Sequence, residues 1–246
     1  MMLGDYMGYI YSKNSVKESI DNNNVKLLYL NSMDHPFFRI AKERKINYKI
    51  VSDKELDKLI GAKSKVLHQG VVALVNDYKY YKIDEIINKS ANHYPLLVML
   101  DSLDDPHNLG AILRICDASG VDGVIIGKNR STRLNETVAR TSTGAIEWVK
   151  VCEVTNLTQT IRYLKENGYF IVGAEYEEKS VMYDECRYDM PICLVIGSEG
   201  FGISELVKKN CDFLVKIPMN GHVNSLNASV SCGILVYEIL EKRNQK

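Results

Sequence analysis

The chain has 246 residues, of which 46% are hydrophobic and 25% are charged, a composition typical of a soluble globular protein. This composition excludes a disordered, collagen-like or disulfide-rich chain. The longest apolar runs, such as Pro95–Leu100 and Ile192–Ile196, are far shorter than the ~20 residues that span a bilayer, so no membrane span is expected. The N-terminus has no basic segment followed by an apolar core, so no secretory signal is predicted.

The formal net charge of zero conceals an uneven distribution. Residues 1–80 carry thirteen Lys/Arg against nine Asp/Glu, and the remainder carries eighteen against twenty-two. The basic excess favours an N-terminal segment that meets a polyanion. The six cysteines form no CxxC pair, and four lie in apolar stretches, where free cysteine behaves as a small hydrophobe. A reduced, cytoplasmic chain without a structural metal is expected.

Residues 1–76 predict a small α/β domain, because short apolar strands alternate with helical stretches. A domain of this size has a small core, so docking or tethering to a partner is expected. The expected elements are a helix at Ser15–Ile20, a strand at Val25–Leu30, a helix at His35–Arg44, a strand at Tyr48–Val51, a helix at Asp53–Ile60 and a strand at Gly70–Val75.

Residues 77–94 are expected to form a linker, with a short helix at Ile83–Lys89. Tyr78, Tyr80 and Tyr81 lie there among lysines. They can pack on a neighbouring domain or stack on RNA, and packing is the favoured interpretation.

Residues 95–246 predict a second domain with a clearer alternation of strands and helices. Its strands are almost continuously apolar, which indicates a largely parallel sheet covered on both faces. Ligands of such sheets bind outside the carboxyl ends of the strands, so the loops there are the candidate site. The expected strands are Leu96–Asp101, Val124–Ile126, Phe170–Ala174, Ile192–Gly197 and Phe213–Met219, and the helices are Asn108–Gly120, Asn135–Thr141, Leu157–Asn167 and Asn227–Arg243.

The first loop, Asp101–Asn108, leads into a helix that is apolar around most of its circumference, which predicts a buried helix. Arg114 would project from it on the narrow polar arc that also holds Asp117. A local ion pair between these two residues, three positions apart, is one interpretation. A functional cation at a strand-end site is the other.

The second loop, Ile196–Ser204, places three glycines directly after an apolar strand, which implies close approach of the backbone to a neighbour. A plain strand-to-helix turn is the simplest interpretation. The spacing G-x-x-G-x-G differs from the dinucleotide fingerprint G-x-G-x-x-G, and no Walker lysine follows. Glu199 inside this turn would repel phosphates, but it could accept hydrogen bonds from ribose hydroxyls.

The third loop, Ile217–Ser229, runs from a strand into the last helix. Ser225 or Asn227 could cap that helix. The loop nevertheless holds more amide and hydroxyl groups than a cap requires. His222 is interpreted as a solvated residue, because no cysteine or acid accompanies it at catalytic or metal spacing. Together the three loops predict a site without a nucleophile–base pair or metal cluster, which acts by positioning and electrostatics.

Three segments, Asp101–Gly120, Ile196–Ser204 and Ile217–Glu238, resemble the three motifs of the SpoU, or TrmH-like, RNA ribose 2′-O-methyltransferases. The N-terminal segment, with HQGVVA at 68–73, resembles the L30e-like substrate-binding domain of the RlmB-type branch, which methylates a guanosine of 23S rRNA. The resemblance implies a SPOUT fold, a parallel sheet with a deep C-terminal trefoil knot. It also implies S-adenosylmethionine as methyl donor, no metal, and a homodimer with sites at the subunit interface.

The resemblance also assigns residues. It implies catalytic roles for Asn108, Arg114, Glu199, Ser225 and Asn227, and cofactor contacts at Ile196, Gly197, Ile217, Pro218, Met219 and Leu226. Because a guanidinium stays charged in ordinary protein environments, Arg114 is expected to stabilise the developing alkoxide and a nearby phosphate rather than act as a base. Glu199 and Asn227 are expected to orient Arg114 and the ribose, and Ser225 is expected to form a hydrogen bond with one of the two.

Three alternatives stay open. The substrate could be tRNA instead of rRNA, because closely similar motifs serve both. The chain could be an RNA-binding protein without catalysis, against which Arg114, Glu199 and Asn227 argue. A nucleotide-binding oxidoreductase is disfavoured by the glycine spacing.

Overall fold

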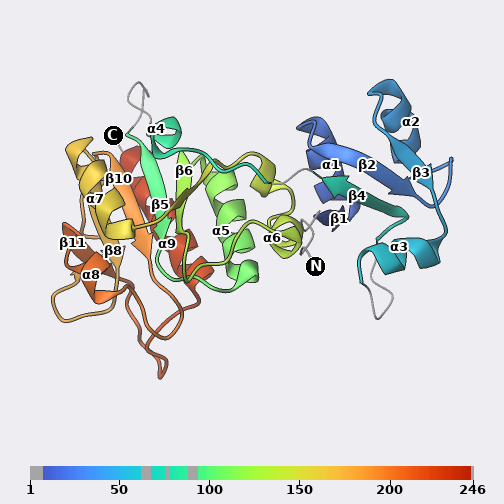
Figure 1. Ribbon diagram of the computed structural model, residues 1–246. Coiled ribbons are helices and arrows are strands. Elements are labelled where there is room, and N and C mark those ends of the chain that lie inside the picture. The colour runs from blue at the N-terminus through green and yellow to red at the C-terminus, as the bar shows by residue number, and fades with distance from the viewer. Residues whose placement is uncertain (1–7, 62–67, 76–77, 88–93, 245–246) are drawn as a thin grey trace, which may run out of the picture. The chain divides into compact units, whose positions relative to one another are not determined.

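Figure 1 shows a computed structural model of the chain, which describes residues 8–61, 68–75, 78–87 and 94–244. The chain divides into two compact units. The first consists of Met1–Tyr78 with Leu134–Glu147, and the second of Lys79–Arg133 with Trp148–Lys246. The segment 134–147 thus belongs to the first unit although it lies within the sequence of the second. In the described part of the chain, no helix has both the length and the apolar character needed to cross a bilayer.

The first unit is built on a four-stranded sheet in the order β1-β4-β2-β3. β2 is antiparallel to β4 and parallel to β3, and β1 adds to the other edge of β4. The strands are β1 (Tyr9–Tyr11), β2 (Val25–Leu30), β3 (Tyr48–Ile50) and β4 (Val71–Val75), and the helices are α1 (Lys13–Asp21), α2 (Pro36–Glu43), α3 (Asp53–Leu59) and α6 (Glu136–Thr141), with a 3₁₀ turn at Ala145–Glu147.

The second unit is a parallel seven-stranded sheet in the order β7-β6-β5-β10-β8-β11-β9. The predicted parallel sheet is therefore confirmed. Its strands are β5 (Leu96–Leu100), β6 (Gly123–Gly127), β7 (Val151–Val154), β8 (Phe170–Ala174), β9 (Val181–Met182), β10 (Ile192–Ile196) and β11 (Phe213–Lys216), and its helices are α4 (Ile83–Ile86), α5 (Pro106–Ser119), α7 (Leu157–Glu166), α8 (Glu205–Lys208) and α9 (Ala228–Asn244).

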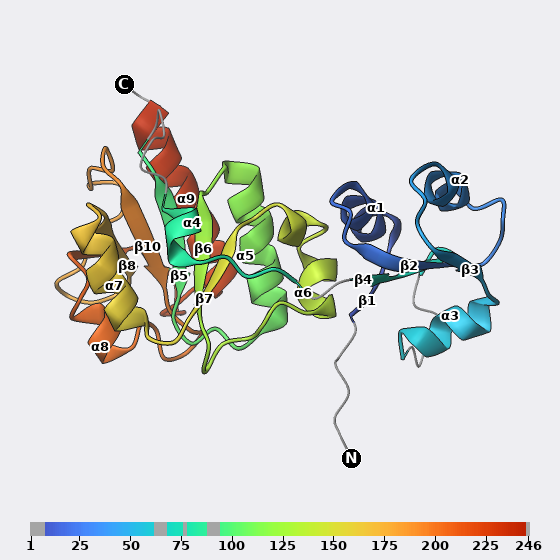
Figure 2. The ribbon, with the colours of Figure 1, turned by 45° about the horizontal axis from the view of Figure 1, so that its top comes forward.

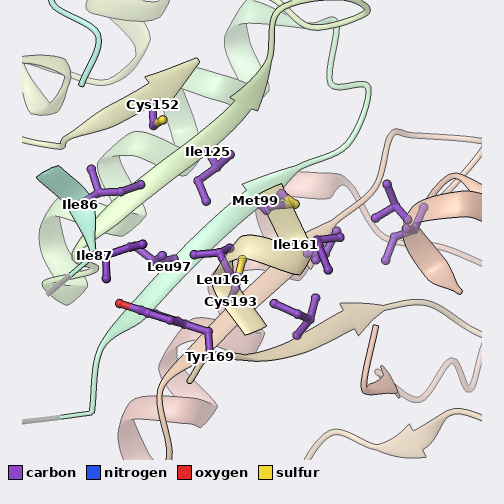
Figure 3. Packing of buried hydrophobic residues seen from close by; sticks show 14 residues of the cluster. Ile86, Ile87, Leu97, Met99, Ile125, Cys152, Ile161, Leu164, Tyr169 and Cys193 are labelled. Carbon is purple, nitrogen blue, oxygen red and sulfur yellow. The ribbon is translucent and has the colours of Figure 1, made fainter. Parts of the chain in front are cut away.

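Helices cover both faces of this sheet, as the apolar strands predict (Figure 2). Alternate strand residues on one face, including Leu97, Met99 and Cys193, pack against α4, α7 and α8 in one buried cluster (Figure 3). α5 and α9 pack against each other and against β6 and β10. Burial raises the pKa of the Cys152 thiol in this cluster to about 11, so the cluster holds it as a neutral apolar group.

Five elements were not predicted from the sequence: β1, β7, β9, α8 and the 3₁₀ turn at Ala145–Glu147. Each is four residues long or shorter, too short to display a period of 2 or 3.6 residues. Part of the predicted linker, residues 77 and 88–93, lies outside the described residues, as does the end of the helix predicted at Ile83–Lys89. In the described part, Tyr81 packs against the core of the second unit, in line with the packing interpretation for that tyrosine.

The last helix, α9, is anchored at both ends. At its C-terminal end Arg243 donates hydrogen bonds to the carbonyl oxygens of Tyr94, Tyr188 and Met190 at 2.7–2.9 Å. Burial without a facing carboxylate in hydrogen-bond contact lowers the pKa of Arg243 to about 10. At its N-terminal end Asn227 accepts hydrogen bonds from the backbone N–H groups of Ser229 (2.9 Å) and Val230. Asn227 is therefore the cap.

Candidate active site

The candidate site lies at the carboxyl ends of four adjacent strands, β5, β10, β8 and β11. The loop after β10 is held on two sides by carboxylates. Asp101, which follows β5, accepts a hydrogen bond from the N–H of Ser204 at 2.8 Å, and Glu175, which follows β8, accepts one from the N–H of Ile203 at 2.8 Å. Because carboxylates that follow two different strands bind its backbone, this loop is held in a fixed position at the site.

The tip of the same loop is a tight turn. Ser198 and Gly202 exchange two backbone hydrogen bonds of 3.0 and 3.1 Å. Gly200 and Gly202 have φ angles of +88° and +65°, which side chains other than glycine rarely adopt. A Cβ on Gly197 would lie 2.1 Å from the carbonyl carbon of Gly202. The glycines therefore allow the loop to fold back on itself.

Three polar side chains from the three predicted loops meet beside this turn. Asn108 donates to Oε1 of Glu199 at 2.9 Å, Asn227 donates to the same oxygen, and Asn227 also donates to Oδ1 of Asn108 at 2.9 Å. Because Oδ1 of Asn227 caps α9, its amide nitrogen must face the carboxylate. No described residue bonds to Oε2 of Glu199, which leaves that oxygen for a ligand.

A pocket of about 420 Å³ adjoins this cluster. Glu199 and Ser225 line it, together with five of the six residues for which cofactor contacts are expected. These five are Ile196, Gly197, Ile217, Met219 and Leu226, whereas Pro218 does not line the pocket. Ser225 forms no side-chain hydrogen bond with the described residues. Its expected bond to Arg114 or the ribose stays a prediction.

Arg114 lies apart from this cluster. It is exposed on α5, six residues after Asn108, which is about 240° around the helix and ~9 Å along it. Within the described ranges it has no hydrogen bond or ion pair, so the predicted local pair with Asp117 does not form. Among the described residues, Arg114 also has no hydrogen bond to Glu199 or Asn227, so its orientation by these two residues stays a prediction. The helix is less buried than predicted, because Ala118 is exposed and Ile115 half-buried.

Sequence reasoning missed Glu175 and Tyr176, which line the pocket from the end of β8. The carboxylate of Glu175 occupies the space next to Gly202. A Cβ added to Gly202 would lie 2.5 Å from Oε2 of Glu175. The signal that could have found it is its position, the first residue after a buried parallel strand. The described residues contain no group of three or more His, Cys, Asp or Glu side chains arranged to hold a metal ion.

Changing Asn227 to aspartate is expected to make stability depend on pH. Asn227→Asp keeps the oxygen that caps α9 but places a second carboxylate against Glu199, which should raise the pKa of one of the two. A carboxyl group whose pKa folding raises loses stabilising free energy as the pH increases through the folded-state pKa. The free energy of unfolding should fall more at pH 8 than at pH 5, by about 1.4 kcal/mol for each unit by which folding raises that pKa above 5.

Denaturant unfolding of Asn227→Asp and the parent chain at both pH values measures this difference. Asn224→Asp is the matched control, because Asn224 lies in the same loop and lines the pocket but makes no hydrogen bond to Glu199. An equal loss of stability at pH 5 and pH 8 would contradict the contact between Asn227 and Glu199.

Comparisons with known proteins agree with this architecture. Residues 95–237 match the SpoU rRNA Methylase family, and residues 9–81 match the family "RNA 2′-O ribose methyltransferase substrate binding". A Staphylococcus haemolyticus protein, assigned to the TrmH family of tRNA/rRNA methyltransferases, is 52% identical over 207 residues, 83% of this chain and 81% of that protein. A Staphylococcus saprophyticus protein with the same assignment is 46% identical over 96% of both chains.

The fold is also shared with solved structures. The SpoU methyltransferase AviRb from Streptomyces viridochromogenes, in complex with AdoMet, superposes with a TM-score of 0.82 at 21% identity, covering 97% of this chain and 91% of that chain. The SPOUT-type fold predicted from the resemblance is confirmed by this likeness, and the expected C-terminal knot and small N-terminal unit are consistent with it. With its motifs meeting at the strand ends, the chain belongs to the SpoU methylase family of RNA methyltransferases.

Proposed function

We propose that this protein transfers a methyl group from S-adenosylmethionine to the ribose 2′-OH of a guanosine in 23S rRNA. The observation that carries the proposal is the meeting of Asn108, Glu199 and Asn227, one from each motif, beside a pocket at the strand ends. The same cluster disfavours an RNA-binding protein without catalysis. A tRNA ribose is the alternative substrate, because the relatives' assignment covers both RNAs.

The pocket fits an adenosyl cofactor. Its volume of about 420 Å³ lies in the range of roughly 300–1,000 Å³ of small-molecule sites. Apolar side chains such as Ile196 and Leu226 line it. Residues 217–226 make no backbone–backbone hydrogen bond with the rest of the described chain, so their N–H and C=O groups can pair with the edges of a base. S-adenosylmethionine supplies a methyl group that its sulfonium already activates.

The protein's own contribution is to hold the ribose and to stabilise charge. The ribose oxygen takes the methyl group as the methyl–sulfur bond breaks, and the hydroxyl proton leaves to water. Glu199, through the free Oε2, accepts a hydrogen bond from a ribose hydroxyl, while Asn108 and Asn227 fix the carboxylate. Arg114 stabilises the negative charge that develops on the oxygen and an adjacent phosphate.

We propose further that the protein acts as a homodimer in which Arg114 completes the site of the partner subunit. Arg114 stands exposed on α5 beside half-buried Ile115, which packs against α9 at Gly233. α9 exposes Val230 (49%) and Tyr237 (52%). An apolar face of this kind, next to an arginine that has no ion pair with the described residues, suits a second copy of the chain.

All six cysteines are free thiols, which supports a cytoplasmic location.

The RNA is proposed to contact the first unit along α2 and β3. The segment 38–49 carries five Lys/Arg and one Glu. Arg39 and Arg44 are paired with Glu43 and Asp21, whereas exposed Lys42 and Lys49 have no ion pair within the described ranges. Phe38 and Tyr48 pack edge to face, with ring centroids 5.1 Å apart, and Lys42 lies 4.8 Å above Phe38. Lysines interleaved with aromatic rings suit RNA phosphates and bases.

Reversing two of these charges should weaken RNA binding strongly. Lys42→Glu/Lys49→Glu is expected to lower RNA affinity about 10-fold or more at low salt and to reduce the salt dependence by roughly 0.7–0.9 log units per lost phosphate contact. Filter binding across a salt series measures both effects. The control is Lys54→Glu/Lys58→Glu on α3, which changes the unit's charge equally. Equal losses in both variants would contradict the placement of RNA on α2 and β3.

The proposed reaction is tested with methyl-labelled S-adenosylmethionine and either unmodified large-subunit rRNA or tRNA. Alkali cannot cleave next to a 2′-O-methyl group, so the label should appear in alkali-resistant dinucleotides from rRNA. Alkali-resistant label in tRNA alone would support ribose methylation but contradict rRNA as the substrate. Label in alkali-sensitive nucleotides would overturn the ribose as target, and no label in either RNA would contradict the proposal.

A further inference from the structure

Phe201 occupies the tip of the turn after β10, and the residue is 94% exposed. The backbone around it is fixed by the paired hydrogen bonds of Ser198 and Gly202 and by the glycine on each side. Burying a phenylalanine side chain ordinarily stabilises a protein, and this fold leaves the side chain of Phe201 exposed instead. A large apolar ring is therefore held in solvent on a rigid support.

The position of the ring points to the substrate. Phe201 lies two residues after Glu199 in the same turn, and it borders the pocket. Other exposed apolar side chains follow neighbouring strand ends: Tyr176 after β8 (56%) and Val223 after β11 (64%). The pocket lining thus includes two exposed aromatic side chains, Phe201 and Tyr176, beside the exposed carboxylate of Glu199. Exposed apolar surface of this kind marks a ligand-binding site.

We infer that Phe201 stacks on a nucleobase of the RNA at the reacting nucleotide. This inference rests on the proposed function: a nucleotide whose ribose reaches Glu199 carries its base away from the carboxylate. RNA-binding proteins hold unpaired bases against aromatic side chains, and each such stack is worth about 5- to 150-fold in affinity. Because the residue is 94% exposed, little of its surface is covered by the pocket, so its ring is available to the RNA rather than to the cofactor.

The kinetic test compares three replacements. Phe201→Ala should raise KM for RNA about 10-fold or more, while the Kd for S-adenosylmethionine, the unfolding midpoint and the sedimentation coefficient stay unchanged. Phe201→Trp should restore KM, and Phe201→Leu should not, because leucine is apolar but cannot stack. Phe170→Ala is the control, because Phe170 is 45% exposed at the opposite end of β8. Rescue by leucine, weaker cofactor binding or a changed sedimentation coefficient would each overturn the inference.

A second readout needs no turnover. In the background Trp148→Phe, which removes the chain's one tryptophan, Phe201→Trp introduces a single reporter at the tip. RNA added with S-adenosylmethionine should quench its emission by stacking, and unquenched emission on bound RNA would overturn the inference. If the wild-type chain methylates neither RNA but the reporter is quenched, the proposed reaction fails and the stack stands. If methylation proceeds without quenching, the proposed reaction stands and the stacking of Phe201 on the RNA is overturned.

Discussion

Replacing Arg114 by alanine is expected to slow methyl transfer about 10²- to 10³-fold, the range measured when one group that stabilises transition-state charge is removed. Arg114 is exposed and has no hydrogen bond or ion pair with the described residues. Its loss should leave the fold and the pocket unchanged, because no lining residue contacts it through a hydrogen bond. The Kd for S-adenosylmethionine should therefore stay constant. Single-turnover transfer and equilibrium dialysis on the same preparation separate the two effects.

Arg162→Ala is the matched control, because Arg162 is exposed on α7 and its replacement removes the same charge far from the loops of the site. This variant should transfer methyl groups at the parental rate. Near-normal turnover of Arg114→Ala would eliminate the catalytic assignment. Arg114→Lys should recover only part of the rate, since lysine keeps the charge but lacks the planar fork that pairs with a phosphate.

A mixture of Arg114→Ala and Asn227→Asp tests where Arg114 acts, because each variant lacks one group of the proposed site and is expected to be inactive or nearly so on its own. Asn108 and Arg114 lie on different sides of α5, and in the structure the arginine makes no hydrogen bond or ion pair with the Glu199 cluster of its own chain. If it serves the partner, a mixed dimer of Arg114→Ala and Asn227→Asp subunits has one intact site, and part of the activity returns. If each chain uses its own Arg114, the mixed dimer has no intact site and stays inactive. That outcome would contradict the shared site.

Adding one methyl group at Gly197 is expected to destabilise the second unit and abolish cofactor binding. In Gly197→Ala the new Cβ would lie 2.1 Å from the carbonyl carbon of Gly202 and 2.4 Å from the nitrogen of Ile203. Both are backbone atoms of a segment whose N–H groups donate hydrogen bonds to Asp101 and Glu175. Moving these atoms aside would therefore cost free energy. Forced overpacking costs about 1–3 kcal/mol, and the upper end applies where backbone must shift.

Denaturant unfolding and equilibrium dialysis with S-adenosylmethionine measure the two consequences of Gly197→Ala. Gly221→Ala is the control, because Gly221 lies in the loop after β11, has ordinary φ, and has open space where a Cβ would stand. It should change neither stability nor cofactor affinity. A Gly197→Ala variant with parental stability would show that the loop after β10 is less rigid than its hydrogen bonds indicate.

Most of the second unit could be predicted from the amino-acid sequence. Continuous apolar strands such as Ile192–Ile196 can only be buried on both faces, so the parallel sheet with helices on both sides followed from the residue pattern alone. The same rule placed the site, because ligands of such sheets bind at the carboxyl ends. This rule singled out the three loops, and the resemblance to the SpoU motifs then singled out Asn108, Glu199 and Asn227 within those segments.

Which atoms meet depends on the three-dimensional packing of the chain. The hydrogen bonds among Asn108, Glu199 and Asn227 join residues up to 119 positions apart, a separation that no local pattern encodes. The same holds for Glu175 against Gly202, and for segment 134–147, which packs with the first unit rather than with the unit around it in sequence. Local periodicity reports which face of an element is buried. Which neighbouring element covers that face depends on long-range packing. For this reason the sequence did not predict the exposed side of α5 or the absence of hydrogen bonds between Arg114 and its expected partners in the described chain.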